Sequence, residues 1–247
     1  MANSQRERLA GKTFLVTGGA QRIGRAFVLA IAQEGGHPII HYGASAQQAF
    51  TLQAEIETMG QKADVLQADL QDPDQTRRLI ENAIALGPLD GLINNAAIFE
   101  PLSWQDTTLD SWERHLAINL TAPFLLCQVF AQQASQPQVR RIINILDWRA
   151  LRPGPDHFPY TIAKAALAAM TRSLAAALAP RICVNGLALG AILPPSDGAA
   201  ADNILESVPA RRWAHLDEVS EALIFLLTGP AYITGEILHI DGGRHLV

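Results

Sequence analysis

The sequence has few cysteines, little charge and no apolar run long enough to cross a membrane. Its two cysteines, Cys127 and Cys183, lie within apolar stretches and lack metal-ligand spacing, so we expect buried, reduced thiols and no metal site. A membrane span needs about 18 consecutive apolar residues. The alanine-rich stretch 163–179 is interrupted by Lys164 and Arg172. We therefore expect no contact with a membrane.

Basic residues are also too few for a typical nucleic-acid-binding protein. The net charge is −5 and no basic cluster stands out, which argues against a nucleic-acid partner. Residues 1–12 are polar and contain no apolar core of the kind found in signal peptides, so we expect a cytoplasmic location. With 49% hydrophobic residues, the 247-residue chain can bury an ample core. We expect one globular domain that spans residues 1–247.

Short β-rich runs alternate with longer helical patterns along almost the whole chain. The predicted strands are Thr13–Val16, Pro38–Tyr42, Asp64–Gln67, Gly91–Asn94, Arg141–Leu146, Ile182–Leu187 and Ile237–Ile240. The predicted helices lie near residues 23–34, 46–59, 73–86, 109–134, 159–179 and 216–228. Several strands are apolar at consecutive positions, which is typical of strands covered on both faces. The pattern predicts an α/β fold with a Rossmann-type, doubly wound, seven-stranded parallel sheet flanked by helices.

The least regular segment is 189–203, which contains Pro194, Pro195 and Gly198. It follows a predicted strand and precedes a short helical piece. A loop in that position could cover a ligand at the carboxyl ends of the strands. A plain surface connection is the alternative.

A glycine-rich turn, Thr17–Gly24, follows the first predicted strand and opens a helix. Glycines let the backbone turn tightly and approach a pyrophosphate. The helix amino terminus offers unpaired N–H groups and a favourable dipole. A turn of this kind, between a strand and a helix, predicts a dinucleotide-binding site.

The end of the second predicted strand, His41–Ser45, has no acidic residue. Sites for NAD usually place a carboxylate there to bind the adenosine ribose hydroxyls. Without it, nothing repels a 2′-phosphate, and Arg22 and Ser45 could receive one because arginine suits phosphate geometry. We therefore expect NADP(H) rather than NAD(H). The alternative for Arg22 is a solvated residue at the start of the helix.

Two further strand ends carry polar or small residues. Asp69 ends the third predicted strand and could accept a hydrogen bond from adenine, or cap the helix that follows Pro73. Asn94–Ala97 ends the fourth, where small residues let the backbone lie against a cofactor and an asparagine can tie neighbouring strands together. Asn119 lies in the middle of a predicted helix, where asparagine is a poor helix former. It could serve a polar task there, or simply face solvent.

Tyr160 and Lys164 lie four residues apart in a predicted helix, and Asp147 lies thirteen residues before the tyrosine. The i, i+4 spacing places both side chains on one face, about 6 Å apart along the axis. An ammonium beside a phenol favours the phenolate, so we expect Lys164 to lower the pKa of Tyr160. Such a tyrosine can exchange a proton with a reacting atom. A surface pair without chemistry is the alternative for this short motif.

Taken together, these pieces resemble the classical short-chain dehydrogenases/reductases over nearly the full chain. The matching pieces are Thr17–Gly24, Asp69, Asn94–Ala97, Asn119, Tyr160 with Lys164, and the tail Asp241-Gly242-Gly243. Within that family, the chain is most similar to the pteridine reductases. Asp147 stands where most members have serine, Arg22 stands where the turn usually has its middle glycine, and Phe99 follows the Asn94–Ile98 run, where pteridine reductases place an aromatic that stacks on the pterin.

The chain also departs from the pteridine-reductase pattern. Gly43-Ala44 replaces a histidine–arginine pair that often grips the 2′-phosphate. Ala97 replaces a serine that often touches substrate and cofactor, and Leu189-Gly190 replaces a Pro-Gly pair. These departures concern the substrate and the strictness of the NADPH preference more than the type of reaction.

The resemblance implies an NADPH-dependent oxidoreductase that transfers hydride to a dihydropterin-like or dihydrofolate-like substrate. It implies Tyr160 as the proton donor, Lys164 on the nicotinamide ribose, and Asn119 as support for a water linked to Lys164. A carboxylate at Asp147 donates a hydrogen bond only when protonated. It can instead accept from Tyr160, or bind the N–H groups of a pterin. A simple cap on the loop that follows is the alternative for Asp147.

The implied contacts fall into two sets. The cofactor contacts are Gly18, Gln21, Arg22, Ile23, Tyr42, Ser45, Asp69, Leu70, Asn95, Ala96, Ala97, Tyr160, Lys164, Gly190 and Ile192. The substrate contacts are Phe99, Asp147, Trp148, Tyr160 and Leu193, although core packing is the alternative for Phe99, Trp148 and Leu193. Two other functions stay open: a short-chain carbonyl reductase or alcohol dehydrogenase, and a non-catalytic NADP(H)-binding sensor. A homotetramer is implied by the resemblance, and the small residues of 159–179 suit close helix pairing.

Overall fold

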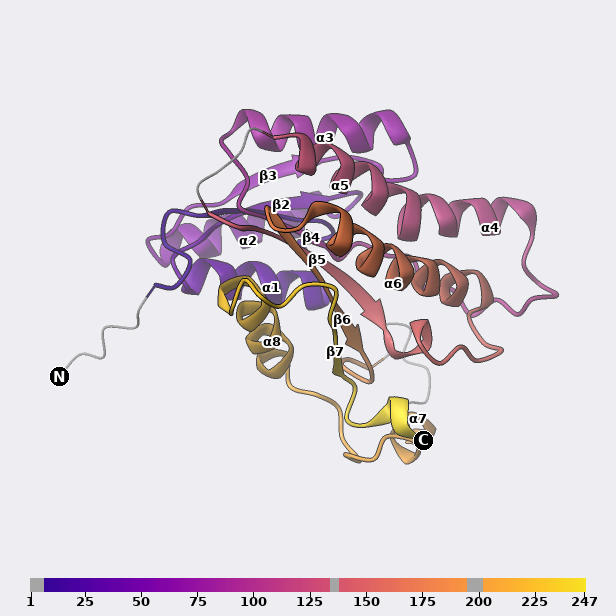
Figure 1. Cartoon of the computed structure of the whole chain (residues 1–247). Helices are drawn as coiled ribbons and strands as arrows, with labels where there is room; N and C mark the ends of the chain where they lie inside the picture. Colours follow the sequence, from indigo (N-terminus) through magenta and orange to yellow (C-terminus); the bar gives the residue numbers. More distant parts are fainter. Residues whose placement is uncertain (1–6, 134–137, 195–201) are drawn as a thin grey trace.

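The computed structural model describes residues 7–133, 138–194 and 202–247 and contains one seven-stranded parallel sheet (Figure 1). The strands are β1 (Thr13–Val16), β2 (His37–Tyr42), β3 (Asp64–Gln67), β4 (Gly91–Asn94), β5 (Arg140–Asp147), β6 (Ile182–Leu189) and β7 (Ile237–Ile240). Their order is β3-β2-β1-β4-β5-β6-β7, and every neighbouring pair is parallel. The expected doubly wound Rossmann-type α/β domain is confirmed.

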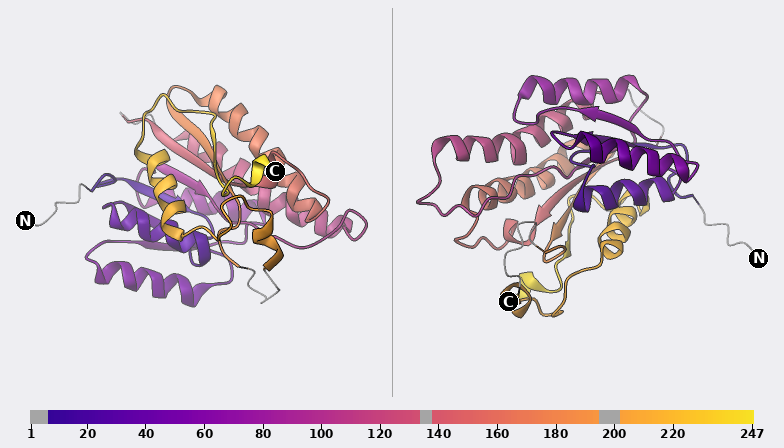
Figure 2. Two further views of the ribbon diagram at one scale, coloured as in Figure 1. Left: turned by 90° about the horizontal axis from the view of Figure 1, so that it is seen from below. Right: turned by 180° about the vertical axis from the view of Figure 1, so that it is seen from behind.

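Helices cover both faces of the sheet, as Figure 2 shows from two further directions. The helices are α1 (Arg22–Gln33), α2 (Ala46–Thr58), α3 (Pro73–Ala85), α4 (Leu109–Leu116), α5 (Ala122–Gln132), α6 (Phe158–Leu178), α7 (Asp202–Glu206) and α8 (Leu216–Thr228). Short helical turns are η1 (Ala117–Thr121), η2 (Trp148–Ala150) and η3 (Arg244–Leu246). Helices α1, α2 and α8 lie on one face, and α3, α5 and α6 lie on the other (Figure 1).

The two-sided core explains why the strands are apolar at consecutive positions. Val16 and Ile40 join the cluster on the α1 face, whereas their neighbours Leu15 and Ile39 join the cluster on the α3 face. All four side chains are fully buried. Because successive strand residues point to opposite faces, a sheet covered on both sides needs an unbroken apolar run.

The observed elements differ from the predicted ones in a few places. β5 is longer than predicted because the polar residues at its ends, Arg140 and Asp147, are paired inside the fold. β6 extends to Leu189 because its last two residues pair with the end of β5. The predicted helix 109–134 is interrupted by the π-helical turn η1. Of the irregular segment 189–203, residues 195–201 lie outside the described residues.

Helix α6 corrects one expectation from the sequence. Its 21 residues are long and apolar enough, by length and composition alone, to cross a membrane. In the fold, however, α6 packs against β5 and β6, and it buries the polar side chains of Tyr160, Thr161 and Lys164. It is the core helix of this face of the sheet.

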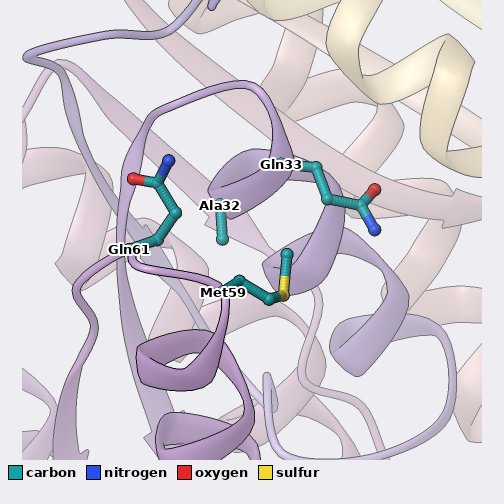
Figure 3. Close-up of a pocket in the computed structure, with 4 residues that line it drawn as sticks. All are labelled: Ala32, Gln33, Met59 and Gln61. Carbon is teal, nitrogen blue, oxygen red and sulfur yellow. The ribbon is translucent and has the colours of Figure 1, made fainter.

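The parallel sheet has two sides that differ in role, one where the carboxyl ends of the strands lie and one where their amino ends lie. We call them the carboxyl edge and the amino edge. The carboxyl ends of the strands meet at one edge, where ligands bind in open α/β sheets. At the opposite edge, a hollow of about 430 Å³ lies between the ends of α1 and α2 and is lined by Ala32, Gln33, Met59 and Gln61 (Figure 3). This hollow is far from every predicted site residue, so the carboxyl edge holds the candidate site.

Candidate active site

The turn after β1 has the shape that the sequence predicts. Gly18 has φ +60°, and a Cβ there would lie 3.0 Å from Cα of Ala96. A Cβ on Gly24 would lie 2.1 Å from the carbonyl oxygen of Gly18. Both positions therefore require glycine, because the turn folds back on itself and against the end of β4. The α1 amino terminus opens directly from this turn, as a phosphate site needs.

Hydrogen bonds fix the turn to the end of β4. The Asn95 side chain donates to the carbonyls of Thr17 (2.8 Å) and Gly18 (3.1 Å). In return, the Thr17 hydroxyl accepts from the backbone N–H groups of Asn95 (2.9 Å) and Ala96 (3.0 Å). Asn95 thus shapes the predicted cofactor site from behind. A second asparagine joins two strands directly, because Asn94 Nδ2 donates to Asn144 Oδ1 (2.8 Å).

His41 also holds the turn, and sequence reasoning missed it. Its Nδ1 accepts from the backbone N–H of Gly18 (3.0 Å), and its Nε2 lies 3.1 Å from the carbonyl oxygen of Ala68. Because Nδ1 accepts, Nε2 carries the proton and donates. Burial lowers the pKa of His41 to about 4, so the ring is neutral at pH 7. The imidazole thereby joins the ends of β1, β2 and β3 at the predicted site.

Arg22 does not lie where the 2′-phosphate hypothesis needs it. It adopts a left-handed conformation, φ +51°, and its guanidinium donates to the carbonyl of Pro194 (3.0 Å), on the loop after β6. Since β2 and β6 are four strands apart in the sheet, the side chain points away from the β2 end. Ser45, in contrast, stands at the amino terminus of α2 and its hydroxyl makes no capping bond. The structure therefore does not bring Arg22 and Ser45 together.

At the end of β3, the capping role belongs to a different residue from the predicted one. Asp72, not Asp69, caps α3 by accepting from the N–H groups of Asp74 and Gln75. Asp69 is exposed, and its carboxylate accepts from the nearby backbone N–H of Gln71 (2.9 Å). The alternative interpretation of Asp69 as a helix cap was therefore wrong.

The remaining predicted contacts line the same edge with varying exposure. Gln21 and Ala97 are exposed, Tyr42 and Gly190 are half-buried, and Leu70 and Ile192 are buried in the core clusters. Leu193 is partly buried and packs against the cluster that contains Ile192. Ile23 is half-buried at the start of α1.

Asp147, Tyr160 and Lys164 do come together in one buried group. The Tyr160 hydroxyl donates to Asp147 Oδ2 (3.3 Å), and Asp147 Oδ1 accepts from the backbone N–H of Arg149 (2.8 Å). Lys164 Nζ lies 5.7 Å from the centre of the Tyr160 ring and donates to the carbonyl of Ile145 (2.6 Å). Asp147 thus caps the η2 turn with one oxygen and accepts from Tyr160 with the other. The two roles predicted as alternatives, a loop cap and a partner of Tyr160, therefore occur together.

The charges in this group correct the expected protonation of Tyr160. Burial, followed by the negative charge of Asp147, raises the pKa of Tyr160 well above its usual value, and Arg149 is the cation that opposes this rise. Burial lowers the pKa of Lys164 to about 8. It also raises the pKa of Asp147, although the nearby Arg149 opposes that shift. Lys164 therefore does not make Tyr160 acidic here, and the phenol keeps its proton at neutral pH.

Asn119 is buried rather than facing solvent, and it lies in the π-helical turn η1. Its side chain accepts from the backbone N–H of Ile98 (3.0 Å) and donates to the carbonyl of the same residue (3.1 Å). Ile98 directly precedes Phe99. Asn119 therefore anchors the segment that presents Phe99 to the site, a role that the sequence did not reveal.

Phe99 faces the site, but another ring already stacks on it. Phe99 is 52% exposed. The His157 imidazole lies 3.8 Å from it at an interplanar angle of 8°, and Tyr160 packs edge-on at 4.7 Å. His157 Nδ1 lies 3.1 Å from Asp156 Oδ2. His157 was not predicted, since it has no motif of its own, yet it shares the aromatic surface expected to receive a flat substrate ring.

Comparisons with known proteins agree with this geometry. The family model described as enoyl-(acyl carrier protein) reductase matches residues 18–245. A 3-oxoacyl-[acyl-carrier-protein] reductase of Synechocystis sp. is 32% identical over 240 residues, which cover 95% of this chain and 97% of the relative. The structure of FolM alternative dihydrofolate reductase 1 from Brucella canis, complexed with NADP, is 35% identical with a TM-score of 0.89, and the match covers 97% of this chain and 96% of that one. A short chain dehydrogenase from Burkholderia cenocepacia, in complex with NADP, is 36% identical with a TM-score of 0.90 over 96% of this chain and 99% of that one.

Proposed function

The chain belongs to the short-chain dehydrogenase/reductase family, and we propose that within it the protein is an NADPH-dependent reductase of pterin-like substrates, such as dihydropterins or dihydrofolate. The observation that carries this proposal is the buried pair of Tyr160 and Asp147, joined at 3.3 Å beside the ring of Phe99. A carboxylate at this place accepts hydrogen bonds from the amino and ring N–H groups of a pterin. An ionised carboxylate cannot donate a hydrogen bond to a carbonyl oxygen, and only the protonated form can.

NADP(H) fits the carboxyl edge of the sheet for three reasons. The Gly18–Gly24 turn and the α1 amino terminus suit a pyrophosphate. The end of β2 has no carboxylate, while Ser45 and the α2 amino terminus can receive a 2′-phosphate. The solved structures most similar to this chain include several in complex with NADP or NADPH. Arg22 then serves the loop after β6 rather than the 2′-phosphate.

The protein groups supply the proton and the positioning. When bound, the nicotinamide cofactor supplies hydride to the carbon of a C=N bond. Tyr160 keeps its proton at neutral pH and gives it to the ring nitrogen, so that one hydride and one proton reduce the bond. Asp147 orients both the hydroxyl and the substrate. Lys164 holds a buried positive charge beside the tyrosine. The family resemblance assigns it the nicotinamide ribose.

The test is a comparison of substrates with purified protein and NADPH. We expect oxidation of NADPH with dihydrobiopterin or dihydrofolate, and little with acetoacetyl-CoA. Turnover of acetoacetyl-CoA or another ketone, with none of any pteridine, would contradict the substrate assignment. Tyr160→Phe removes the proton donor without a large change in shape. We expect it to lower kcat by about 10²-fold or more and leave the dissociation constant of NADPH little changed.

A second candidate function is the reduction of a 3-oxoacyl thioester. The 32% identity to a 3-oxoacyl-[acyl-carrier-protein] reductase, over 95% of this chain, favours it. Asp147 argues against it, because a β-keto oxygen needs a hydrogen-bond donor at that position. Asp147→Ser separates the two functions. It should weaken pteridine turnover, and a gain of ketone turnover would show that the carboxylate sets the preference.

A further inference from the structure

Two guanidinium groups, those of Arg149 and Arg244, pack on the ring of Trp148, the residue after Asp147. Cζ of Arg149 lies 4.8 Å from the ring centre and Cζ of Arg244 lies 4.7 Å from it. Trp148 directly follows Asp147, and η2 packs against η3, so the last residues of the chain return to the candidate site. In Figure 1 the chain ends near α7, beyond the carboxyl ends of β5 and β6. The C-terminal turn therefore lies beside the candidate site, and we call this turn, together with Trp148, Arg149 and Arg152, the rim.

The positive charges of this rim are not equally neutralised. Arg149 lies 2.7 Å from Asp156 and 3.5 Å from Asp147. Neither Arg152 nor Arg244 forms an ion pair with a carboxylate in the described part of the chain. Nη1 of Arg244 is buried without a hydrogen-bond partner among the described residues. Burial lowers the pKa of Arg244, as do the charges of Arg149 and Arg152, while the carboxylate of Asp156 opposes this shift. Three guanidinium groups thus lie close together, and the ion pairs with Asp147 and Asp156 are made by Arg149.

We propose that Arg244, with Arg152 beside it, binds an anionic group on the tail of the substrate while the pterin ring lies against Asp147 and Phe99. This inference rests on the proposed function. An anion against the accessible part of the Arg244 guanidinium would relieve the repulsion among the three guanidinium groups, because charge-assisted hydrogen bonds from arginine to carboxylate or phosphate are strong and directional. The preferred substrates are therefore pterins whose side chain ends in a carboxylate or a phosphate.

The test compares charged and uncharged pterins in the wild type and in Arg244→Gln. Dihydrofolate carries carboxylates, dihydroneopterin monophosphate carries a phosphate, and dihydrobiopterin has an uncharged tail. We expect the substitution to raise KM about tenfold for the charged substrate that the site recognises, and to leave KM for dihydrobiopterin unchanged. Added salt should raise the same KM in the wild type but not in the variant. The two charged substrates distinguish a carboxylate site from a phosphate site.

Arg78→Gln, on the exposed side of α3, is the matched control and should change no KM value. Equal effects of Arg244→Gln on charged and uncharged pterins, or no effect on either, would overturn the inference. Titration with p-aminobenzoylglutamate, which has carboxylates but no pterin ring, tests the rim without turnover. Binding that Arg244→Gln weakens supports the anion site even if no pteridine is reduced, whereas equal binding by the wild type and the variant overturns it.

Discussion

At the scale of single residues, the protonation states of Asp147, Tyr160 and Lys164 depend on one another. All three are largely shielded from water, where a charge is costly unless it is paired. The Tyr160 hydroxyl donates a hydrogen bond to the carboxylate of Asp147, while the Lys164 ammonium donates one to the carbonyl of Ile145. This division suits reduction, since the tyrosine stays protonated until a substrate nitrogen can accept its proton.

Lys164 gives this site a predicted pH dependence. Its pKa, lowered by burial to about 8, means that the side chain is charged below about pH 8 and neutral above it. Activity that needs the ammonium is therefore present at lower pH and lost as the pH rises. We expect kcat/KM to fall through about pH 8 in a profile from about pH 6 to about pH 10. In Lys164→Arg, which stays charged, this fall should disappear even if the overall rate is lower. A fall that persists in the variant would point to another group.

His41 provides a second prediction at the residue scale. His41→Leu would leave the Gly18 N–H and the Ala68 carbonyl buried and unpaired, at a cost of about 1–3 kcal/mol each. We expect a lower Tm and a KM for NADPH raised about tenfold, with little change in kcat. His37→Leu is the matched control, because His37 is the first residue of the same strand and lies at the amino end of β2, away from the cofactor turn. A lower Tm with an unchanged KM would mean that His41 supports the fold but not the cofactor turn.

At the scale of elements, the π-helical turn η1 connects two distant parts of the site. Asn119, in this turn, makes both of its hydrogen bonds to the backbone of Ile98, one residue before Phe99. Such turns disturb the regular helix ladder and are frequent at functional sites. The turn therefore holds the Phe99 segment at a fixed distance from the helix layer that carries Tyr160.

Asn119→Ala tests this connection. Loss of two buried hydrogen bonds should lower stability by about 1–3 kcal/mol and raise KM for the pterin more than KM for NADPH. Asn185→Ala is a closely matched control. Asn185 is equally buried and also bonds backbone groups, the carbonyl of Ile233 and the N–H of Glu236, but it lies toward the other edge of the sheet. Equal effects of the two variants on KM for the pterin would contradict the proposed role of Asn119.

The sequence predicts local features of the elements well and contacts between distant elements poorly. All seven strands are predicted from short β-rich runs, and the glycine turn follows from its place between β1 and α1. The break at η1 is absent from the prediction because one π turn lies inside an otherwise continuous helical stretch and has no sequence pattern of its own. The contacts of His41, His157 and Arg244 also depend on chain segments brought together only by the fold. For the same reason, the spacing of Tyr160 and Lys164 predicts a shared face but not the partner of each group.

At the scale of the whole molecule, an exposed stripe along α6 bears on assembly. Ile162, Ala169 and Ala176 are seven residues apart and all exposed, so they follow one side of the helix while the opposite side packs on the sheet. Exposed large apolar side chains also lie on the neighbouring α4 and α5, at Leu109 (68% exposed) and Phe124 (44% exposed). The small side chains of Ala169 and Ala176 allow close pairing of helices from two subunits, with Arg172 and Ser173 exposed between them.

The homotetramer implied by the family resemblance stays a prediction, and we expect α6 to lie at one of its interfaces. Light scattering of the wild type should give a mass about four times the 26.7 kDa of the chain. Ala169→Glu places a charge in the middle of the stripe, where pairing would bury it without a partner, so this variant should have a smaller mass. Gln47→Glu, on the exposed side of α2, adds the same charge elsewhere and should leave the mass unchanged. A monomeric wild type would contradict the assembly, and a tetrameric Ala169→Glu would place the interfaces away from α6.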